Sequence, residues 1–239
     1  MRKRRFIGRV NGQRGIVEDG EFHHFVNVLR GRKGTEFILV TRDGRAYEAV
    51  VTEIDRKRRV VLARLSRMLE NKETPERSGV FVAFALFSEN RLKFMLEKCT
   101  EIGVKGFLPF VAERSKRKGE QVREGWLKVI ESAVKQSGRM DFPGVYEVRD
   151  LVSTIEMAEN LGNIYLLDVK GKNINDIVLK DGNHVIFVGP EGGFTEGENK
   201  MLKDRAKGII SLGSNVLRTE TAAIVASYQF LNKIKNKRR

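Results

Sequence analysis

The sequence has little of several residue types, and each scarcity excludes a class of protein. Its one cysteine, Cys99, excludes an internal disulfide and any zinc site built on cysteines. Three histidines are too few for a His-rich metal cluster. Four prolines among 239 residues exclude a Pro-rich linker protein. We therefore expect a globular chain without a metal.

Long apolar runs are also missing. No stretch approaches the roughly 20 apolar residues that a membrane-spanning helix needs. The start of the chain is basic but lacks the apolar segment of a signal peptide. Hydrophobic residues make up 41% of the chain, enough for a core and too many for extended disorder. We expect a cytoplasmic protein with no membrane partner.

What the chain does have is positive charge. The formal net charge is +14 and the pI is about 10.0. Residues 1–74 carry a net +8 and residues 75–239 a net +6 over more than twice the length. Such a basic protein usually meets a polyanion, and nucleic acid is the leading candidate. The alternative is a basic surface that only keeps the protein soluble.

The first third of the chain has the pattern of a small β-barrel. Short runs rich in Val, Ile and Phe predict strands, and Asp43-Gly44 between two of them is a strong hairpin signal. Glu21–Arg30 predicts one short helix, which Gly31 could end. Barrels of this kind often bind RNA. The predicted strands cover 4–10, 35–41, 45–54 and 59–65.

After a polar segment the pattern changes to alternating strands and helices. Val80–Phe87 is continuously apolar, as in a strand buried on both faces of a parallel sheet. We therefore predict a barrel over 1–70, a linker over 71–78 and an α/β domain over 79–239. Its further strands are expected at 106–111, 165–169, 185–188 and 209–212, and its helices at 91–102, 122–137, 196–207 and 219–235.

Three segments at the carboxyl ends of predicted strands could form a site, because ligands of open α/β sheets bind at that edge. The first, residues 188–194, has three glycines that let backbone approach a ligand closely. It lacks the lysine of a phosphate-binding Walker loop and the spacing of a dinucleotide turn. It can equally be a strand-to-helix turn, with Thr195 as N-cap and Glu198 completing a capping box.

The second segment, residues 211–223, combines an irregular loop with the start of the last helix. Backbone amides at that start could bind an anion, and Arg218 adds a fixed positive charge. Alternatively, Thr219 is simply the N-cap and Arg218 is solvated. The third segment is the end of the strand at Leu166-Leu167-Asp168, whose apolar residues could wall a pocket, although core packing suits Leu166 better.

These motifs resemble those of one known family. The sequence GPEGGFTEGE followed by LGSNVLRTETAA resembles the small-subunit ribosomal RNA methyltransferase E family, within the SPOUT superfamily of S-adenosylmethionine enzymes. The similarity continues upstream in Lys98–Val104, Glu113–Ser115 and Lys135–Arg139, and near the start in Arg5-Phe6 and His23-His24. It spans nearly the whole chain.

The resemblance implies a fold, a cofactor and a substrate. The fold would be α/β, with a C-terminal SPOUT-type domain tied in a deep trefoil knot and an N-terminal PUA-like β-barrel. Such knots are rare, so periodicity alone does not predict one. S-Adenosyl-L-methionine would be the cofactor, and a homodimer would convert a uridine of 16S rRNA in the 30S subunit to 3-methyluridine.

The chemistry of this reaction suggests catalytic roles for three residues, and the resemblance indicates the loops that would hold the cofactor. Arg218 would stabilise the uracil anion, because uracil N3 bears a proton at neutral pH and is a poor nucleophile until it leaves. Glu191 would orient the base or accept that proton. Glu220 is less suited as a base, because the first turn of a helix favours a carboxylate as a cap. The expected cofactor-binding residues are Leu166, Leu167, Val188, Gly189, Pro190, Glu191, Gly192, Gly193, Ser211, Leu212, Gly213, Val216, Leu217, Arg218, Thr219, Glu220 and Ala222.

Basic residues outside these loops are the expected RNA contacts, and several of them have an alternative role. The two histidines could instead serve local packing, the cluster at Arg114 could be a solvated loop, and Arg139 could complement a helix dipole. The expected RNA-binding set is Arg2, Arg4, Arg5, Arg9, His23, His24, Arg30, Arg32, Arg114 and Arg139. A non-catalytic RNA-binding or ribosome-assembly protein, or a related methyltransferase with another RNA target, remains the alternative function.

Overall fold

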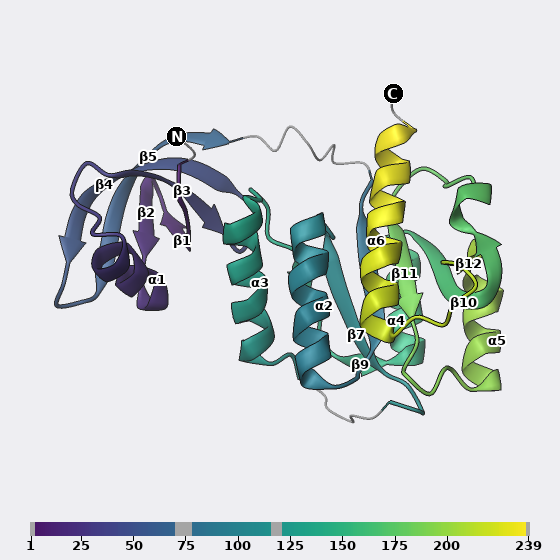
Figure 1. The fold of residues 1–239 in the computed structure, drawn as a ribbon. Coiled ribbons are helices and arrows are strands. Elements are labelled where there is room, and N and C mark those ends of the chain that lie inside the picture. Colours follow the sequence, from purple (N-terminus) through teal and green to yellow (C-terminus); the bar gives the residue numbers. More distant parts are fainter. Residues whose placement is uncertain (1–2, 70–77, 116–120, 238–239) are drawn as a thin grey trace. The chain divides into compact units, whose positions relative to one another are not determined.

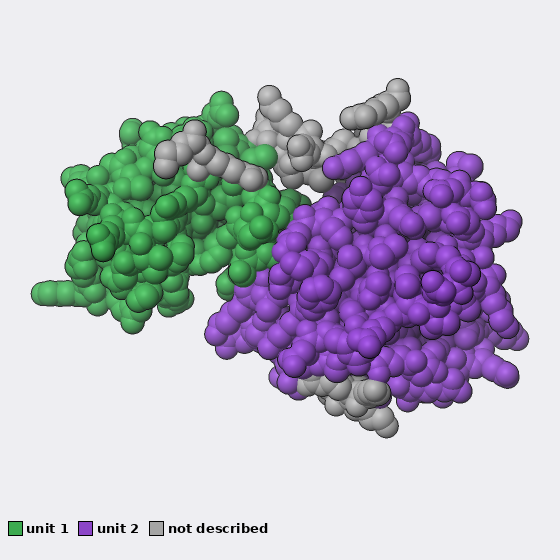
Figure 2. All heavy atoms as spheres, viewed as in Figure 1, with its two compact units in different colours: residues 1–73, 131–142 green, residues 74–130, 143–239 purple. Residues whose placement is uncertain are grey.

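The computed structural model describes residues 3–69, 78–115 and 121–237 (Figure 1). The chain forms two compact units, 1–73 with 131–142 and 74–130 with 143–239 (Figure 2). The predicted boundaries place 131–142 in the second domain, whereas the contacts group these residues with the barrel. Most of the predicted linker, 71–77, and the predicted RNA contact Arg2 lie outside the described residues.

The first unit is a closed five-stranded barrel in the order β1-β2-β5-β4-β3. β1 closes the barrel by pairing in parallel with β3, and the other neighbours are antiparallel. The predicted turn at Asp43-Gly44 joins β3 to β4, with Gly44 at φ +84°. The bounds are β1 (Arg5–Asn11), β2 (Arg14–Val17), β3 (Glu36–Thr41), β4 (Ala46–Asp55) and β5 (Val60–Leu69).

Aromatic side chains fill the barrel. Phe6 meets Phe25 and Phe37 edge to face, with ring centroids 5.1 and 5.4 Å apart. Phe25 comes from the segment predicted as one helix, which is a short helix α1 (Asp19–His23) followed by a π-helical turn η1 (His24–Val28). The irregular turn lets this segment bury Phe22, Phe25 and Val26 in the core of the barrel.

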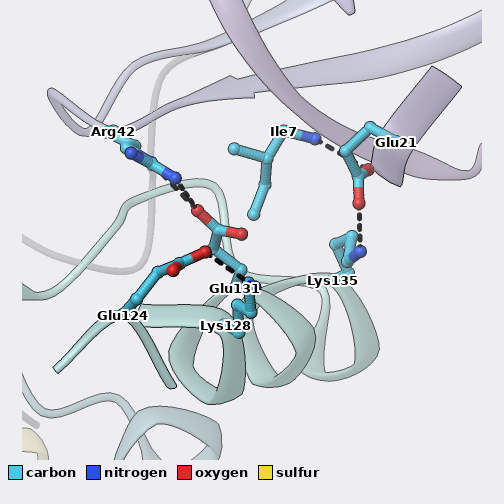
Figure 3. A network of polar contacts seen from close by, with 7 residues as sticks. All are labelled: Ile7, Glu21, Arg42, Glu124, Lys128, Glu131 and Lys135. Carbon is cyan, nitrogen blue, oxygen red and sulfur yellow. Dashed lines mark hydrogen bonds and ion pairs between the residues drawn. The ribbon is translucent and has the colours of Figure 1, made fainter. Parts of the chain in front are cut away.

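The carboxyl-terminal half of α3 (Glu124–Ser137) belongs to the first unit because ion pairs join it to the barrel (Figure 3). Lys135 donates to Glu21, which also accepts a hydrogen bond from the backbone nitrogen of Ile7 at 3.2 Å. Arg42 Nε donates to the Glu131 carboxylate at 2.9 Å. No sequence pattern pairs these residues, because they are far apart along the chain.

The second unit is a parallel sheet in the order β12-β10-β11-β6-β7-β8, with β9 also pairing with β7. Neighbouring strands of this sheet run parallel, as the apolar run at β6 predicts. The bounds are β6 (Val80–Ala85), β7 (Gly106–Val111), β8 (Gly144–Val145), β9 (Arg149–Asp150), β10 (Asn163–Asn173), β11 (His184–Val188) and β12 (Gly208–Ser211).

Helices cover both faces of this sheet (Figure 1). Phe81, Ala83 and Ala85 of β6 face a core cluster that includes residues of α4 (Leu151–Leu161) and α5 (Glu196–Arg205). Phe84, on the other face, meets Trp126 of α3, and α2 (Glu89–Ile102) lies beside α6 (Thr219–Asn236) there. The predicted fold class, an α/β domain with a small barrel, is confirmed, and the trefoil knot stays a prediction.

This topology determines where a site can form. β12, β10 and β11 are direct neighbours, so the loops after them meet at one edge of the sheet. β10 is longer than predicted, and its pairing with β12 shifts register between Leu167 and Lys172. Leu167, Asp168 and Val169, at the start of that irregularity, line the cavity described below.

Candidate active site

A cavity of about 590 Å³ lies at the carboxyl edge of β10, β11 and β12. All three predicted loop segments contribute to its wall, which mixes apolar side chains, glycine backbone and charged groups. The lining residues are Arg91, Arg114, Leu167, Asp168, Val169, Val188, Gly189, Pro190, Glu191, Gly192, Gly193, Phe194, Asn199, Ile210, Leu212, Gly213, Asn215, Val216, Leu217, Arg218, Thr219 and Ala222.

The glycine loop, residues 189–193, is a tight turn that needs glycine at two positions for different reasons. Gly193 has φ +69°, a conformation that glycine adopts without strain, and its nitrogen donates to the Pro190 carbonyl at 2.9 Å. A Cβ at Gly189 would meet the ring of Phe194 at 2.9 Å. The loop therefore presents backbone rather than side chain to the cavity at these positions.

The turn that follows the glycine loop is held by its own capping box. Thr195 caps α5 and Glu198 reaches back to the Thr195 nitrogen at 2.9 Å, as the sequence predicts. Glu198 is buried and also accepts from the backbone nitrogen of Glu113 at 2.8 Å. The structural and the functional interpretations of this segment are thus compatible.

The start of α6 forms another part of the wall. Arg218 is the N-cap residue, so the alternative in which Thr219 is the N-cap is wrong. Thr219 is already helical, and its hydroxyl donates to the carbonyl oxygen of Gly189 at 3.3 Å. Arg218 makes no side-chain cap hydrogen bond and is exposed at the cavity. Its guanidinium is therefore placed where a ligand could meet it.

Arg91 is the main residue that sequence reasoning missed. It lies in the first turn of α2, and its guanidinium pairs with Glu191 of the glycine loop. A second ion pair joins it to Glu220 of α6 at 3.7 Å, and its Nε donates to Ser88 Oγ at 2.8 Å. The missing signal is strand order, since only the pairing of β6 with β11 brings α2 to this edge.

Further polar groups in the wall come from both predicted and unpredicted positions. Arg114, expected to contact RNA, donates to the carbonyl oxygen of Gly192 at 3.1 Å and lines the cavity. Asp168 at the end of the predicted strand accepts from the backbone nitrogen of Lys170 at 2.9 Å. Asn199 of α5 lines the cavity and was not predicted. Their side chains give the cavity both donors and acceptors.

Three of the expected cofactor-binding residues lie outside the wall. Leu166 is fully buried in the core cluster, as its apolar strand position suggests. The Ser211 hydroxyl exchanges hydrogen bonds with the backbone of Gly213. Glu220 is 6% exposed and contacts Arg91 rather than the cavity. Any contact of these three with a cofactor stays a prediction.

The expected RNA contacts of the first unit differ in the exposure of their side chains. Arg9 is paired with Glu18 at 3.1 Å, and Arg5 is half-buried. The Arg139 side chain is only 8% exposed and donates to Asp141 at 2.7 Å, so little of it can meet a ligand. The exposed members are Arg4, Arg9, His23, His24, Arg30 and Arg32.

The described residues hold neither a metal cluster nor a membrane-spanning helix. Within 3–69, 78–115 and 121–237, no group of three or more His, Cys, Asp or Glu is arranged to hold a metal ion. None of the helices in those ranges has the length and apolar character needed to cross a bilayer. The single cysteine, Cys99, is buried, and burial raises the pKa of its thiol to about 12.

Comparison with known proteins gives matches along most of the chain. Residues 74–230 match a family model described as an RNA methyltransferase domain, and residues 17–61 match an RNA methyltransferase PUA domain. The Ribosomal RNA small subunit methyltransferase E of Bacillus subtilis is 30% identical over 87% of this chain and 88% of its own length. Its Mycobacterium bovis counterpart is 33% identical over 90% and 85%.

Solved structures show the same similarity. A Neisseria gonorrhoeae Ribosomal RNA small subunit methyltransferase E bound to S-adenosyl methionine is 27% identical, with a TM-score of 0.79, over 96% of this chain and 98% of that one. A Legionella pneumophila putative methyltransferase in complex with the same cofactor is 26% identical, with a TM-score of 0.80, over 98% of each chain.

Proposed function

Because the chain belongs to the ribosomal RNA small subunit methyltransferase E family, we propose that it methylates N3 of one uridine in 16S rRNA. The methyl donor would be S-adenosylmethionine, bound in the cavity at the edge of β10, β11 and β12. The observation that carries this proposal is the cavity itself. Its wall joins a glycine loop, an exposed arginine and the first turn of a helix.

The residues of the wall suit this cofactor. A volume of about 590 Å³ lies within the range of roughly 300–1,000 Å³ that is usual for small-molecule sites. Leu167, Val188 and Leu212 offer apolar surface for the adenine ring. The glycine loop offers backbone groups to the polar edges of the ligand, and Asp168 and Asn199 can bind hydroxyl or amino groups.

When bound, S-adenosylmethionine supplies a methyl group already activated by a sulfonium. The residues of the chain then have to align the uracil and manage its charge. Arg218 is exposed at the cavity, where its positive charge can stabilise the uracil once N3 has lost its proton. The residues of the wall would hold N3 facing the methyl group that the bound cofactor would supply.

The ion pair of Glu191 with Arg91 favours one of the two roles expected for Glu191. As a base it would accept the N3 proton, and as an orienting group it would hold the uracil in place. Its ion pair with Arg91 fixes the carboxylate at the wall and occupies it with a cation. This geometry favours the orienting role, and the N3 proton would then leave to water.

The barrel would hold the RNA. Arg4, Arg30 and Arg32 are exposed on the first unit, and their side chains can neutralise backbone phosphates. Contacts of this type carry affinity rather than sequence information. The choice of the target uridine would then depend on the cavity and on the shape of the rRNA around it.

A homodimer is the assembly we propose. α2 and α6 lie side by side (Figure 1). Each helix has one exposed aromatic side chain. Phe94 of α2 is 48% exposed and Tyr228 of α6 is 61% exposed. Exposed apolar surface of this kind favours association. Sedimentation of wild type and of a F94E/Y228E variant tests this, with a monomeric variant expected.

The function is tested by mapping the modified nucleotide. Purified protein, labelled cofactor and 30S particles from a strain lacking the enzyme are incubated, and the 16S rRNA is digested for mass analysis. We expect one methyl group, on N3 of one uridine. Methylation of another base or another RNA would overturn the substrate assignment. Absence of both cofactor binding and methylation would favour a non-catalytic RNA-binding protein.

A further inference from the structure

We propose that Glu220 is a specificity-determining residue that favours the positively charged methyl donor over its neutral demethylated product. The proposal rests on the cofactor proposed above. It concerns the Arg91 cluster, which we define as Arg91, Glu191 and Glu220. The cluster joins three elements, α2, the glycine loop and α6, around one side of the cavity.

The cluster has one carboxylate more than its guanidinium can neutralise. Glu191 pairs closely with Arg91, and Glu220 lies 3.7 Å from the same guanidinium. Glu220 is 6% exposed, and its Oε2 is buried without a hydrogen-bond partner among the described residues. A buried carboxylate oxygen without a hydrogen bond costs free energy. A positive charge in the neighbouring cavity would offset that cost.

The charges of the cavity wall give the carboxylate its effect. Among the described residues, the wall carries Arg91, Arg114 and Arg218 against Asp168 and Glu191, a net charge of +1. Two charged residues outside the wall pair with it: Lys203 with Asp168 at 4.0 Å and Glu220 with Arg91 at 3.7 Å. Glu220 lowers the positive charge around the cavity by one, and without it a sulfonium would enter a more positive site. Water is largely excluded from Glu220, so its field is screened less than that of a surface carboxylate.

Methyl transfer changes the ligand charge that this field acts on. When the methyl group leaves, both electrons of the carbon–sulfur bond stay on sulfur, and the sulfonium becomes a neutral thioether. The amino and carboxyl groups of the ligand carry the same charges before and after transfer. Glu220 therefore favours the donor through the sulfur alone, and the product loses that attraction, which eases its release.

The test compares three ligands by calorimetric titration of the full chain. S-Adenosylmethionine and sinefungin are positively charged at or near the sulfur position, and S-adenosylhomocysteine is neutral there. Glu220→Gln keeps the shape of the side chain and removes its charge. We expect it to weaken binding of both cations at least about fivefold more than binding of the neutral product. Glu159→Gln is the matched control, because it removes a surface carboxylate that pairs with Arg205. It should leave the ratio of the affinity for each cation to the affinity for the neutral product unchanged.

Each outcome decides the question. If Glu220→Gln lowers all three affinities equally, Glu220 is only structural and the proposal is wrong. If that variant does not fold by circular dichroism, Glu220→Ala, which removes the same charge, takes its place and must shift the ratio in the same direction. If wild type binds neither S-adenosylmethionine nor S-adenosylhomocysteine, the proposed cofactor fails instead, so the two failures are distinguishable.

Discussion

Thr219 donates a hydrogen bond from its hydroxyl to the carbonyl oxygen of Gly189, 3.3 Å away, and so joins the first turn of α6 to the glycine loop. The two residues are thirty positions apart, and both line one cavity. Because neither residue belongs to the sheet, this bond helps to set the width of the site. The site is therefore assembled by tertiary contacts rather than by one motif.

Removing that bond should loosen the site without unfolding the protein. Thr219→Val keeps the shape of the side chain and removes the hydroxyl. A net hydrogen bond contributes about 1 kcal/mol, so we expect the affinity for S-adenosylmethionine to fall about fivefold. Thr219→Ser keeps the hydroxyl and should bind nearly as wild type. Equal affinities of the valine variant and wild type, measured by calorimetry, would show that the bond does not shape the site.

Arg218 should act on the chemical step. Loss of one group that stabilises developing negative charge typically costs a factor of about 100 or more in rate. We expect Arg218→Ala to slow single-turnover methylation by about that factor, measured at saturating cofactor so that a change in cofactor affinity does not enter the rate. Arg218→Lys keeps the charge and should recover part of the rate. An unchanged rate in the alanine variant would remove Arg218 from the mechanism.

His184 should make the stability of the protein depend on pH. It begins β11 in contact with the rings of Tyr165 and Phe230, and burial lowers the pKa of its imidazole to about 4. In the unfolded state the pKa of His184 is near 6.5, so as the pH falls the unfolded protein binds the proton before the folded protein does. The stability that neutral His184 contributes is thus complete above about pH 6.5 and falls as the pH drops towards 4, by about 3 kcal/mol.

The measurement is urea unfolding at pH 7.5 and pH 5 for wild type and His184→Phe. Phenylalanine can pack against the same two rings and does not titrate. The free energy of unfolding of the variant should therefore fall less than that of wild type from pH 7.5 to pH 5. If the free energy of unfolding falls equally in both proteins, a group other than His184 causes the pH dependence.

RNA binding should depend on the exposed arginines of the barrel. In a nitrocellulose filter assay with 30S particles, Arg30→Ala/Arg32→Ala should weaken binding and reduce the salt slope by about 1 for each phosphate that is no longer neutralised. Arg139→Gln is the comparison, because the Arg139 side chain is nearly buried against Asp141 and should affect stability more than the slope. Equal salt slopes in wild type and the double variant would show that Arg30 and Arg32 do not contact RNA phosphates.

Much of this architecture could be predicted from the sequence, and the failures have physical causes. The apolar run at Val80–Phe87 correctly indicated a strand buried on both faces, and the resemblance to the methyltransferase family is confirmed. Arg91 escaped notice because its role depends on strand order, which periodicity does not contain. The grouping of Glu131 and Lys135 with the barrel depends on ion pairs between residues about ninety or more positions apart.

The most direct test of the proposed site is a crystal structure of the protein soaked with S-adenosylmethionine at saturating concentration. We predict cofactor density between the glycine loop and residues 212–218, with the sulfur on the side of Arg91 and Glu191. Density for the cofactor elsewhere on the protein, or none in a cavity that stays open to solvent in the crystal, would contradict this prediction.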